Sequence, residues 1–288
     1  MTVLETIQKS AEFLGRKKVE APRLQIELLL AHLLKMPRMK LYLNFDRVLT
    51  AAETDAVREL VRRRGLREPL QQILGTTSFC GLEIGVSRSA LIPRPETELL
   101  AELGWQFLER RAAPTALDFG TGTGCIAIAL AVKCPPARIT ALDVSADALA
   151  LARENAAKCN VLDRVEFTLG NGLAAWENPG ARPPAFDLLI SNPPYIPTAE
   201  IETLEPEVRD FDPRAALDGG ADGLDFYRAL AGQAKNFLKP DGCLMVEFGA
   251  GQAPAVAKIF EGEKWIVEGI REDYSQRARI LTARAFRP

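Results

Sequence analysis

Strand-like and helix-like segments alternate through the second part of this chain, from Thr115 onward. The strand-like segments are short apolar runs at 116–119, 138–143, 165–169, 186–191, 243–248, 265–270 and 280–286. The helix-like segments show apolar residues at helical spacing, at 125–133, 146–159 and 224–237. Because strands that alternate with helices pair in parallel, this pattern predicts an α/β fold with helices on the faces of one sheet.

The first 75 residues follow a helical pattern only. Apolar residues recur at helical spacing from Leu4 to Leu14, and Pro22 suits the first turn of a second helix. Thr50 and Glu53 have the spacing of a capping box for a third helix. Residues 76–90 switch to the pattern of a short β-hairpin. We therefore expect a helical domain at 1–75, a hairpin linker at 76–90 and the α/β domain at 91–288.

Composition narrows the class of protein. With 47% hydrophobic and 26% charged residues among 288, the chain is typical of soluble globular proteins. Its net charge of −2 argues against a dedicated nucleic-acid binder, which would carry a strongly basic surface. The first 20 residues lack a signal-peptide pattern, and no stretch approaches the roughly 18 apolar residues of a membrane span. We expect a cytoplasmic protein without a membrane partner.

The cysteines do not form a metal-binding pattern. The chain has five cysteines and a single histidine, His32, and no two cysteines have C-x-x-C spacing. A zinc site needs clustered Cys or His ligands, so no metal site is predicted. An odd number of cysteines also argues against a disulfide framework, and we expect reduced cysteines at packing positions.

A local cluster of basic residues stands out in the helical domain. It consists of Arg58, Arg62, Arg63, Arg64 and Arg67. Such a cluster is typical of a solvated helix face. The alternative is a docking surface for an acidic or RNA-bearing partner, and the sequence leaves both interpretations open.

A glycine-rich loop follows the first strand of the α/β domain and opens its first helix. It consists of Asp118, Phe119, Gly120, Thr121, Gly122, Thr123 and Gly124. Glycines at such a junction let the backbone turn sharply and approach a ligand closely. The spacing is D-x-G-x-G-x-G, whereas a dinucleotide site has G-x-G-x-x-G and would need glycine at Cys125. This mismatch disfavours a nicotinamide oxidoreductase.

Further candidate cofactor residues follow the next two strands. Asp143 ends the second strand about 20 residues after the loop, where an acidic side chain can accept both ribose hydroxyls; Val144 comes next in the chain. The alternative is an N-cap, formed by Asp143 or Ser145. Asn171 and Gly172 follow the third strand, where an adenine would lie, and an ordinary turn explains them equally well.

Residues 192–195 read Asn-Pro-Pro-Tyr, directly after an apolar run. Two prolines cannot donate backbone hydrogen bonds, and they push the preceding residue toward extended geometry. The strand must therefore stop at Asn192, where spare carbonyl acceptors and the Tyr195 ring suit a planar NH₂ group. A simple strand-ending turn is the alternative.

Together these motifs resemble the peptide chain release factor N(5)-glutamine methyltransferases, class I S-adenosylmethionine-dependent enzymes, over nearly the whole chain. Besides the glycine loop, Asp143 and 192–195, the resemblance rests on four segments: PLQQILG at 69–75, LIPRPETE at 91–98, LDGGADGL at 217–224, and EFG at 247–249 with Gln252. The Asn-Pro-Pro-Tyr motif is shared with enzymes that methylate exocyclic amines of nucleobases. The segment at 91–98, placed after a small helical domain, is much more specific.

The resemblance implies a seven-stranded, Rossmann-like methyltransferase domain with its last strand antiparallel, and an N-terminal domain of five helices that helps to dock the release factor. It also implies methyl transfer from S-adenosylmethionine to the glutamine amide in the Gly-Gly-Gln motif of class 1 peptide chain release factors, a protein methylation linked to translation termination. The products would be the methylated protein and S-adenosylhomocysteine. We expect a monomer that needs no metal.

For this reaction we expect Asn192 Oδ1 and the Pro193 carbonyl to accept the two N–H bonds of the substrate amide. This aims the nitrogen at the methyl group and stabilises positive charge as it forms. Tyr195 would pack against the amide plane, and Pro194 would fix the turn.

Arg94 and Glu96 are candidates to hold the entry between the domains; a structural salt bridge is the alternative. The segment 197–223 has little periodicity, and a lid or substrate-contact role is expected for so long a loop beside the tetrapeptide. The family usually has an acidic residue where this chain has Asn171.

Two other functions stay open. A methyltransferase acting on an exocyclic amine of a nucleobase in RNA or DNA would use the same tetrapeptide chemistry, but would need a basic or aromatic surface for nucleic acid. A non-catalytic binding module would use the helical domain as an adaptor, and the intact cofactor and amide motifs argue against it.

Overall fold

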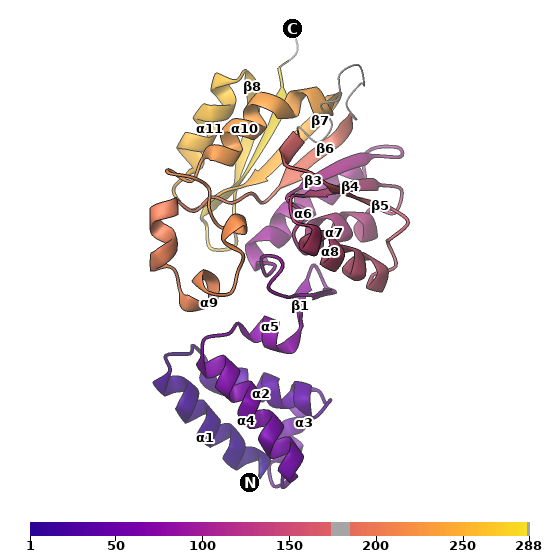
Figure 1. Cartoon of the computed structure of the whole chain (residues 1–288). Coiled ribbons are helices and arrows are strands. Elements are labelled where there is room, and N and C mark those ends of the chain that lie inside the picture. The colour runs from indigo at the N-terminus through magenta and orange to yellow at the C-terminus, as the bar shows by residue number, and fades with distance from the viewer. Residues whose placement is uncertain (174–184, 287–288) are drawn as a thin grey trace. The chain divides into compact units, whose positions relative to one another are not determined.

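The computed structural model describes residues 1–173 and 185–286, which form two compact units (Figure 1). The first unit consists of residues Met1–Thr76 together with Glu205–Phe211. The second consists of Thr77–Leu204 and Asp212–Pro288. Each unit has its own hydrophobic core.

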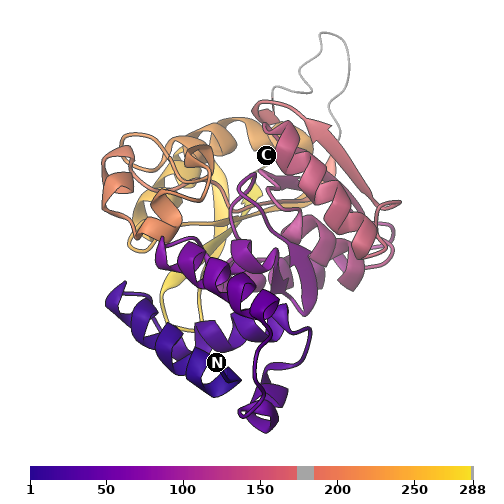
Figure 2. The same ribbon diagram turned by 60° about the horizontal axis from the view of Figure 1, so that its bottom comes forward.

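The first unit is a bundle of helices whose longest members lie side by side (Figure 2). Its helices are α1 (Val3–Arg16), α2 (Pro22–Leu33), α3 (Arg38–Leu41), η1 (Tyr42–Asn44), α4 (Ala51–Gly65) and α5 (Leu70–Leu74). The capping box predicted at Thr50 and Glu53 is confirmed, because each side chain accepts a hydrogen bond from the other's backbone amide. A second capping box at Thr2 and Glu5 begins α1.

The segment Glu205–Phe211, which contains α9 (Pro206–Arg209), packs in this first unit because arginines at the end of α4 bind it. Arg64 is only 4% exposed, and its Nη2 donates to Glu207 Oε1 at 2.6 Å. Arg67 donates to Glu205 Oε2 at 2.9 Å and lies 2.5 Å from Glu207 Oε2. An acidic partner for these two arginines therefore comes from the chain itself.

The other arginines of the basic cluster pair with nearby carboxylates. Arg58 and Arg62 are exposed and bind Asp55 and Glu59 on their own helix. The prediction of a solvated helix face is therefore right for these two, but it is wrong for the buried Arg64.

The second unit contains a seven-stranded sheet with the strand order β5-β4-β3-β6-β7-β9-β8. Its strands are β3 (Thr115–Phe119), β4 (Arg138–Asp143), β5 (Val165–Leu169), β6 (Phe186–Ser191), β7 (Leu238–Glu247), β8 (Trp265–Glu272) and β9 (Ala278–Ala285). All pairs are parallel except those of β9, which runs antiparallel to both of its neighbours. The predicted α/β fold and antiparallel last strand are confirmed, as is the hairpin of β1 (Thr76–Phe79) and β2 (Leu82–Gly85).

Helices cover both faces of the sheet (Figure 1). They are α6 (Pro95–Leu108), α7 (Cys125–Lys133) and α8 (Ala146–Lys158) on one face, and α10 (Asp225–Gln233), η5 (Ala234–Phe237) and α11 (Ala253–Gly262) on the other. The predicted helix at 224–237 thus ends in a 3₁₀ turn, and β7 begins five residues before the predicted strand. Helix α11 was not predicted, although Pro254 at its start is a helix-initiation signal.

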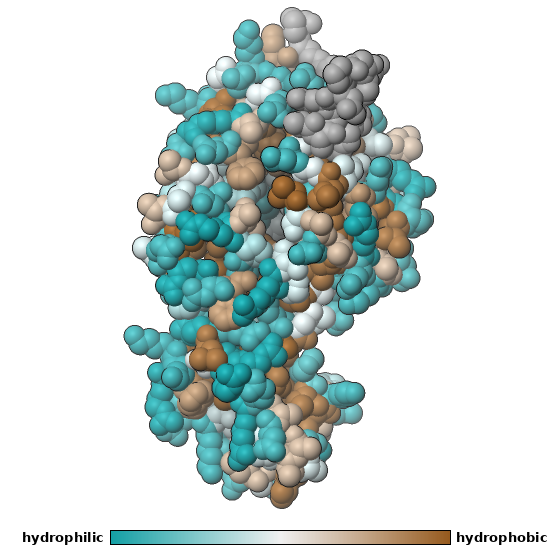
Figure 3. All heavy atoms as spheres, in the orientation of Figure 1, coloured by the Kyte–Doolittle hydropathy of each residue, from teal (hydrophilic) through white to brown (hydrophobic). Residues whose placement is uncertain are grey.

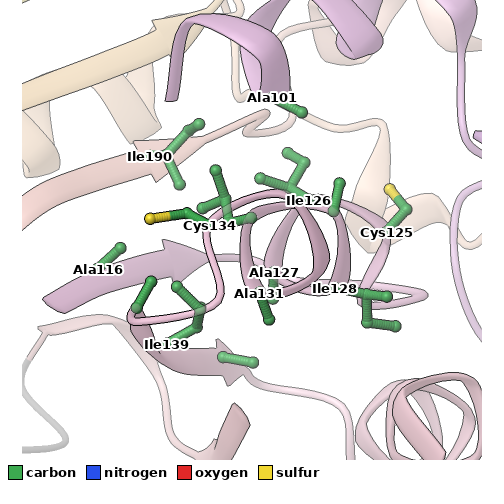
Figure 4. Packing of buried hydrophobic residues seen from close by; sticks show 14 of the residues in the cluster. Ala101, Ala116, Cys125, Ile126, Ala127, Ile128, Ala131, Cys134, Ile139 and Ile190 are labelled. Carbon is green, nitrogen blue, oxygen red and sulfur yellow. The ribbon is translucent and has the colours of Figure 1, made fainter. Parts of the chain in front are cut away.

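Successive residues of the strands enter opposite cores, as the two-residue period of a strand requires. In β6, Leu188 and Ile190 belong to the core beneath α7, and Leu189 belongs to the core beneath α10 and α11. Figure 4 shows Ala116, Ile139 and Ile190, from three strands, gathered around α7. Burial on both faces explains why these strands read as continuous apolar runs.

The order of the strands creates a switch point between β3 and β6. From β3 the chain continues to β4 and β5 on one side, and it then returns to β6 and β7 on the other. In sheets of this kind, ligands bind outside the carboxyl ends of the strands at such a point. In the connecting segments η3 (Thr198–Thr203) and η4 (Arg214–Ala216) are short 3₁₀ turns. Among the described residues, no helix is both long and apolar enough to cross a membrane.

Candidate active site

The glycine loop lies at the carboxyl end of β3, beside the switch point. Gly120 and Gly124 have φ of +73° and +81°, which other residues rarely adopt. A side chain at Gly124 would also meet Ala152 at 3.0 Å, whereas nothing lies within 4 Å of the Cβ position at Gly120. The loop therefore packs tightly against α8 on one side and leaves backbone open on the other.

Asp118 holds the loop from inside. Its Oδ2 accepts hydrogen bonds from Thr121 Oγ1 at 2.6 Å and from the Ala127 amide at 3.1 Å. Burial raises the pKa of this carboxyl to about 7, against the opposing effect of these hydrogen bonds. Its other oxygen, Oδ1, is buried and has no hydrogen-bond partner among the described residues.

Asp143 connects the glycine loop to the start of α8. Its Oδ2 accepts from the Gly122 amide at 2.8 Å, and its Oδ1 accepts from the Ser145 amide at 2.9 Å. The N-cap itself is Ser145, whose side chain accepts from Ala148. Asp143 therefore lies beside the loop without being the N-cap, and each carboxylate oxygen keeps lone pairs for further donors.

Two candidate regions for a nucleoside base lie at the ends of the next strands. Val144 exposes 62% of its surface, and Figure 3 shows hydrophobic side chains at the surface where Figure 1 labels β3 and β4. Asn171 is exposed and Gly172 is half-buried, just after β5. The amide of Gly170 donates to the Asp143 carbonyl at 3.0 Å, which ties this turn to β4.

Asn192 follows β6 and is anchored by a buried chain of hydrogen bonds. Its Nδ2 donates to Thr97 Oγ1 at 3.0 Å, and the Thr97 hydroxyl donates to Glu247 Oε2 at 2.8 Å. Thr97 lies in the first turn of α6, and Glu247 ends β7. Because Nδ2 faces Thr97, Asn192 Oδ1 faces away from these partners. Thr97 and Glu247 were not predicted as site residues, although both fall in segments of the resemblance.

The rest of the tetrapeptide is braced by residues 217–223. The Ile196 amide donates to the Leu217 carbonyl at 3.0 Å, and the Gly219 amide donates back to the Ile196 carbonyl at 2.9 Å. A side chain at Gly219 would lie 2.9 Å from the Pro194 carbonyl. Among the described residues, no donor reaches the Pro193 carbonyl. The carbonyl therefore remains available as an acceptor beside Asn192.

Gln252 fixes the backbone at Tyr195. Its Nε2 donates to the Tyr195 carbonyl at 2.9 Å, and its Oε1 accepts from the Gly249 amide at 2.9 Å. A side chain at Gly249 would lie 3.0 Å from the Tyr195 ring. The ring itself is half-buried, and burial raises the pKa of its hydroxyl.

Arg94 pairs with Asp212, and Glu96 is not its partner. Arg94 Nη2 lies 2.6 Å from Asp212 Oδ2, and the aspartate side chain is fully buried. Burial raises the pKa of Asp212 to about 6, which the arginine opposes. This ion pair binds the segment before α6 to the chain that follows α9, so Arg94 has a structural contact within the second unit.

The residues of the loop fit S-adenosylmethionine. The buried, unpartnered oxygen of Asp118 suits a cationic ammonium group. Asp143 suits ribose hydroxyls, and the exposed Val144 offers an apolar face for adenine. Among the described residues, no three His, Cys, Asp or Glu side chains form a metal-binding cluster. All five cysteines are free.

The fold and this site define a Rossmann-like methyltransferase. A family model described as "PrmC N-terminal domain" matches residues 5–75, and one described as "Methyltransferase small domain" matches residues 97–204. A methyltransferase structure from Pyrococcus furiosus has the same fold, with a TM-score of 0.51 and 20% identity over 72% of this chain and 90% of that one.

Curated relatives are more specific. A release factor glutamine methyltransferase from Geobacter sulfurreducens is 47% identical over 90% of this chain and 88% of its own length. One from Chlorobaculum tepidum is 41% identical over 99% of this chain and 97% of its own length. The chain belongs to the release factor glutamine methyltransferase family, and the predicted resemblance is confirmed.

Proposed function

We propose that this protein transfers a methyl group from S-adenosylmethionine to the side-chain amide nitrogen of a glutamine, in the Gly-Gly-Gln motif of class 1 peptide chain release factors. Membership of the family supports the substrate. The observation that carries the chemistry is the anchored Asn192, whose Nδ2 is bound to Thr97 so that its Oδ1 is free to accept.

An amide nitrogen is a weak nucleophile because its lone pair is delocalised into the carbonyl. When bound, S-adenosylmethionine supplies an activated methyl group and leaves as S-adenosylhomocysteine. The protein has to position the nitrogen and stabilise the positive charge that develops there. Neither task requires a strong base, because the nitrogen becomes positively charged as it gains the methyl group and then releases one of its N–H protons to solvent, which leaves the neutral N-methyl amide.

Asn192 Oδ1 and the Pro193 carbonyl accept the two N–H bonds of the substrate amide. These acceptors hold the nitrogen in one orientation, and their partial negative charges favour the transition state over the neutral amide. Pro194 fixes the turn, and the Tyr195 ring packs against the amide plane. The hydrogen bond from Gln252 to the Tyr195 carbonyl supports this arrangement.

Asp118, Asp143, Val144 and the backbone from Phe119 to Gly124 hold the cofactor, with Asn171 and Gly172 beside the adenine. Arg94 and Glu96 lie at the start of α6, near the turn that carries Thr97, and we assign them to the entry for the substrate. The helical first unit docks the release factor. Because translation factors act in the cytoplasm, we place the protein there. We also propose that it acts as a monomer.

Mass spectrometry tests the proposal directly. A release factor is incubated with the protein and S-adenosylmethionine, and a single added methyl on the Gly-Gly-Gln glutamine is expected. Parallel reactions contain tRNA, rRNA or DNA. Methylation of a nucleic acid with an unmodified release factor would instead establish the nucleobase activity, and no methylation of any substrate would reject both.

A further inference from the structure

The side-chain amide of Asn192 has two orientations of equal shape and opposite chemistry. In one, Oδ1 faces the reaction and accepts a hydrogen bond; in the other, Nδ2 takes its place and donates. A substrate amide that must be held through its own N–H bonds needs the first orientation. Packing alone cannot select it, because oxygen and NH₂ are nearly the same size.

Hydrogen bonding does select it. The Thr97 hydroxyl has one proton, and donating that proton to Glu247 leaves its lone pairs to face Asn192. Only the NH₂ group of Asn192 can then bond to Thr97. The same NH₂ group also lies within hydrogen-bonding range of the Glu247 carboxylate.

We propose that Thr97 and Glu247 are positioning residues that fix the orientation of the Asn192 amide, and that methyl transfer requires the side chain at position 247 to accept the hydrogen bond from Thr97, as the ionised Glu247 carboxylate does. This inference rests on the proposed function of Asn192. Neither residue needs to touch the substrate, because each acts through the hydrogen bond to the next.

Both residues are held rigidly enough for this role. Thr97 and Glu247 are 3% and 2% exposed. The Tyr227 hydroxyl donates to the Glu247 carbonyl at 2.8 Å, and this fixes the end of β7. A buried and connected network of this kind has few alternative arrangements.

The ionisation state of Glu247 controls which group donates and which accepts in the hydrogen bonds that link Asn192, Thr97 and Glu247. Burial raises its pKa to about 7, opposed first by the hydrogen bond from Thr97 and then by the charge of Arg279 on β9. Glu96 on α6 adds a raising effect. The other titratable groups around it are the hydroxyls of Tyr195 and Tyr227, whose pKa values are themselves raised by burial.

Below that pKa, Glu247 takes up one proton from solvent and becomes a donor. A neutral carboxyl group can donate to Thr97 Oγ1, and the Thr97 hydroxyl then turns its own proton toward Asn192. The Asn192 amide then flips so that Oδ1 accepts from Thr97. Its NH₂ group now faces the substrate, in the position where Oδ1 accepted the substrate N–H. At saturating S-adenosylmethionine, kcat should therefore fall on the acid side, and this acid limb should depend on Glu247.

The first test compares Thr97→Val with Thr97→Ser. Valine keeps the shape and removes the hydroxyl, and kcat is expected to fall about 100-fold, the cost of misplacing a reacting group. Serine restores the hydroxyl and should recover most of kcat. S-adenosylmethionine affinity, measured by calorimetry, should be the same in both variants. Equal kcat values for the two variants would overturn the role of Thr97.

The second test uses Glu247→Gln, which stays neutral at every pH. Its Oε1 can still accept the hydrogen bond from Thr97. Because the amide does not take up a proton, a fall in pH cannot exchange the donor and acceptor roles of Thr97 and residue 247. The wild type should lose kcat as pH falls below about 7, and the variant should show no such limb. An acid limb that persists unchanged in Glu247→Gln would overturn the proposal.

Failure of this inference is distinct from failure of the proposed function. If the wild type does not methylate a release factor at all, the function is wrong. If it does, and Thr97→Val is as active as the wild type, only the positioning role is wrong.

Discussion

The side chain of Asn155 binds both backbone groups of Gly85. Its Oδ1 accepts from the Gly85 amide at 2.8 Å, and its Nδ2 donates to the Gly85 carbonyl at 3.0 Å and to the Thr123 carbonyl at 2.9 Å. One fully buried amide on α8 thus joins the β-hairpin to the glycine loop.

Asn155→Ala should lower the free energy of unfolding by about 3 kcal/mol, because it leaves a buried amide and two carbonyls without partners. Urea unfolding measures the loss. The matched control is Glu154→Ala at the exposed neighbouring position, where a change within about 0.5 kcal/mol is expected. Equal stability of the two variants would mean that the bridge contributes nothing.

Asn192→Ala should reduce kcat by about 100- to 1,000-fold, since it removes one acceptor of the developing charge. The affinity for S-adenosylmethionine, measured by calorimetry, should stay near that of the wild type. Full activity in this variant would rule out the proposed mechanism.

Asp143→Ala should weaken S-adenosylmethionine binding by about 10- to 100-fold, the cost of one or two hydrogen bonds to a charged group. Isothermal calorimetry measures the affinity. Asp147→Ala removes an exposed carboxylate from the first turn of α8 and serves as the control, with unchanged affinity expected. If both variants bind equally well, Asp143 does not hold the ribose.

The free energy of unfolding should depend on pH through the titration of Glu247. Its pKa in the folded state is raised from 4.5 to about 7, so its contribution to stability is complete below about pH 4.5 and is lost as pH rises to about 7. Compared with Glu247→Gln, the wild type should therefore lose up to roughly 3 kcal/mol across this window. Urea unfolding at several pH values measures the difference, and a constant difference would contradict the raised pKa.

Glu207→Ala should release the segment Glu205–Phe211 from the first unit, because Arg64 and Arg67 lose their shared carboxylate. Cleavage by a protease within 197–223 should become several-fold faster, since it requires the segment to open locally. Glu200→Ala, an exposed residue of η3, is the control. Equal cleavage rates would show that the ion pairs do not hold the segment.

Local patterns in the sequence were sufficient to predict most of the second unit. Strands β4, β5 and β6 and helix α7 have the predicted limits, because buried parallel strands and a glycine-opened helix leave strong local signals. Helix α11 was missed because Gly249 and Gly251 before it and Pro254 in its first turn are typical of a loop. The family was predicted from motifs, and the relatives confirm it.

Contacts between segments that are distant along the chain could not be predicted from the sequence. In the sequence Arg64 is one more residue of a basic helix face, whereas its half-buried partner Glu207 is 143 positions away. The sequence places Arg94 two positions from Glu96, whereas the folded protein pairs it with Asp212, 118 positions away. Ion pairs of this kind follow from the fold, because no local pattern records which carboxylate a long side chain reaches.

The sequence by itself determined the chemistry that residues 192–195 can offer, since proline geometry and an asparagine at a strand end are local properties. Only the tertiary structure decided which way that asparagine faces. Thr97 comes from a helix start and Glu247 from a neighbouring strand, 95 and 55 positions from Asn192 along the chain, and the sheet brings them together. The orientation of the amide depends on which neighbouring groups donate and which accept hydrogen bonds, and Thr97 and Glu247 become neighbours of Asn192 only when the chain folds.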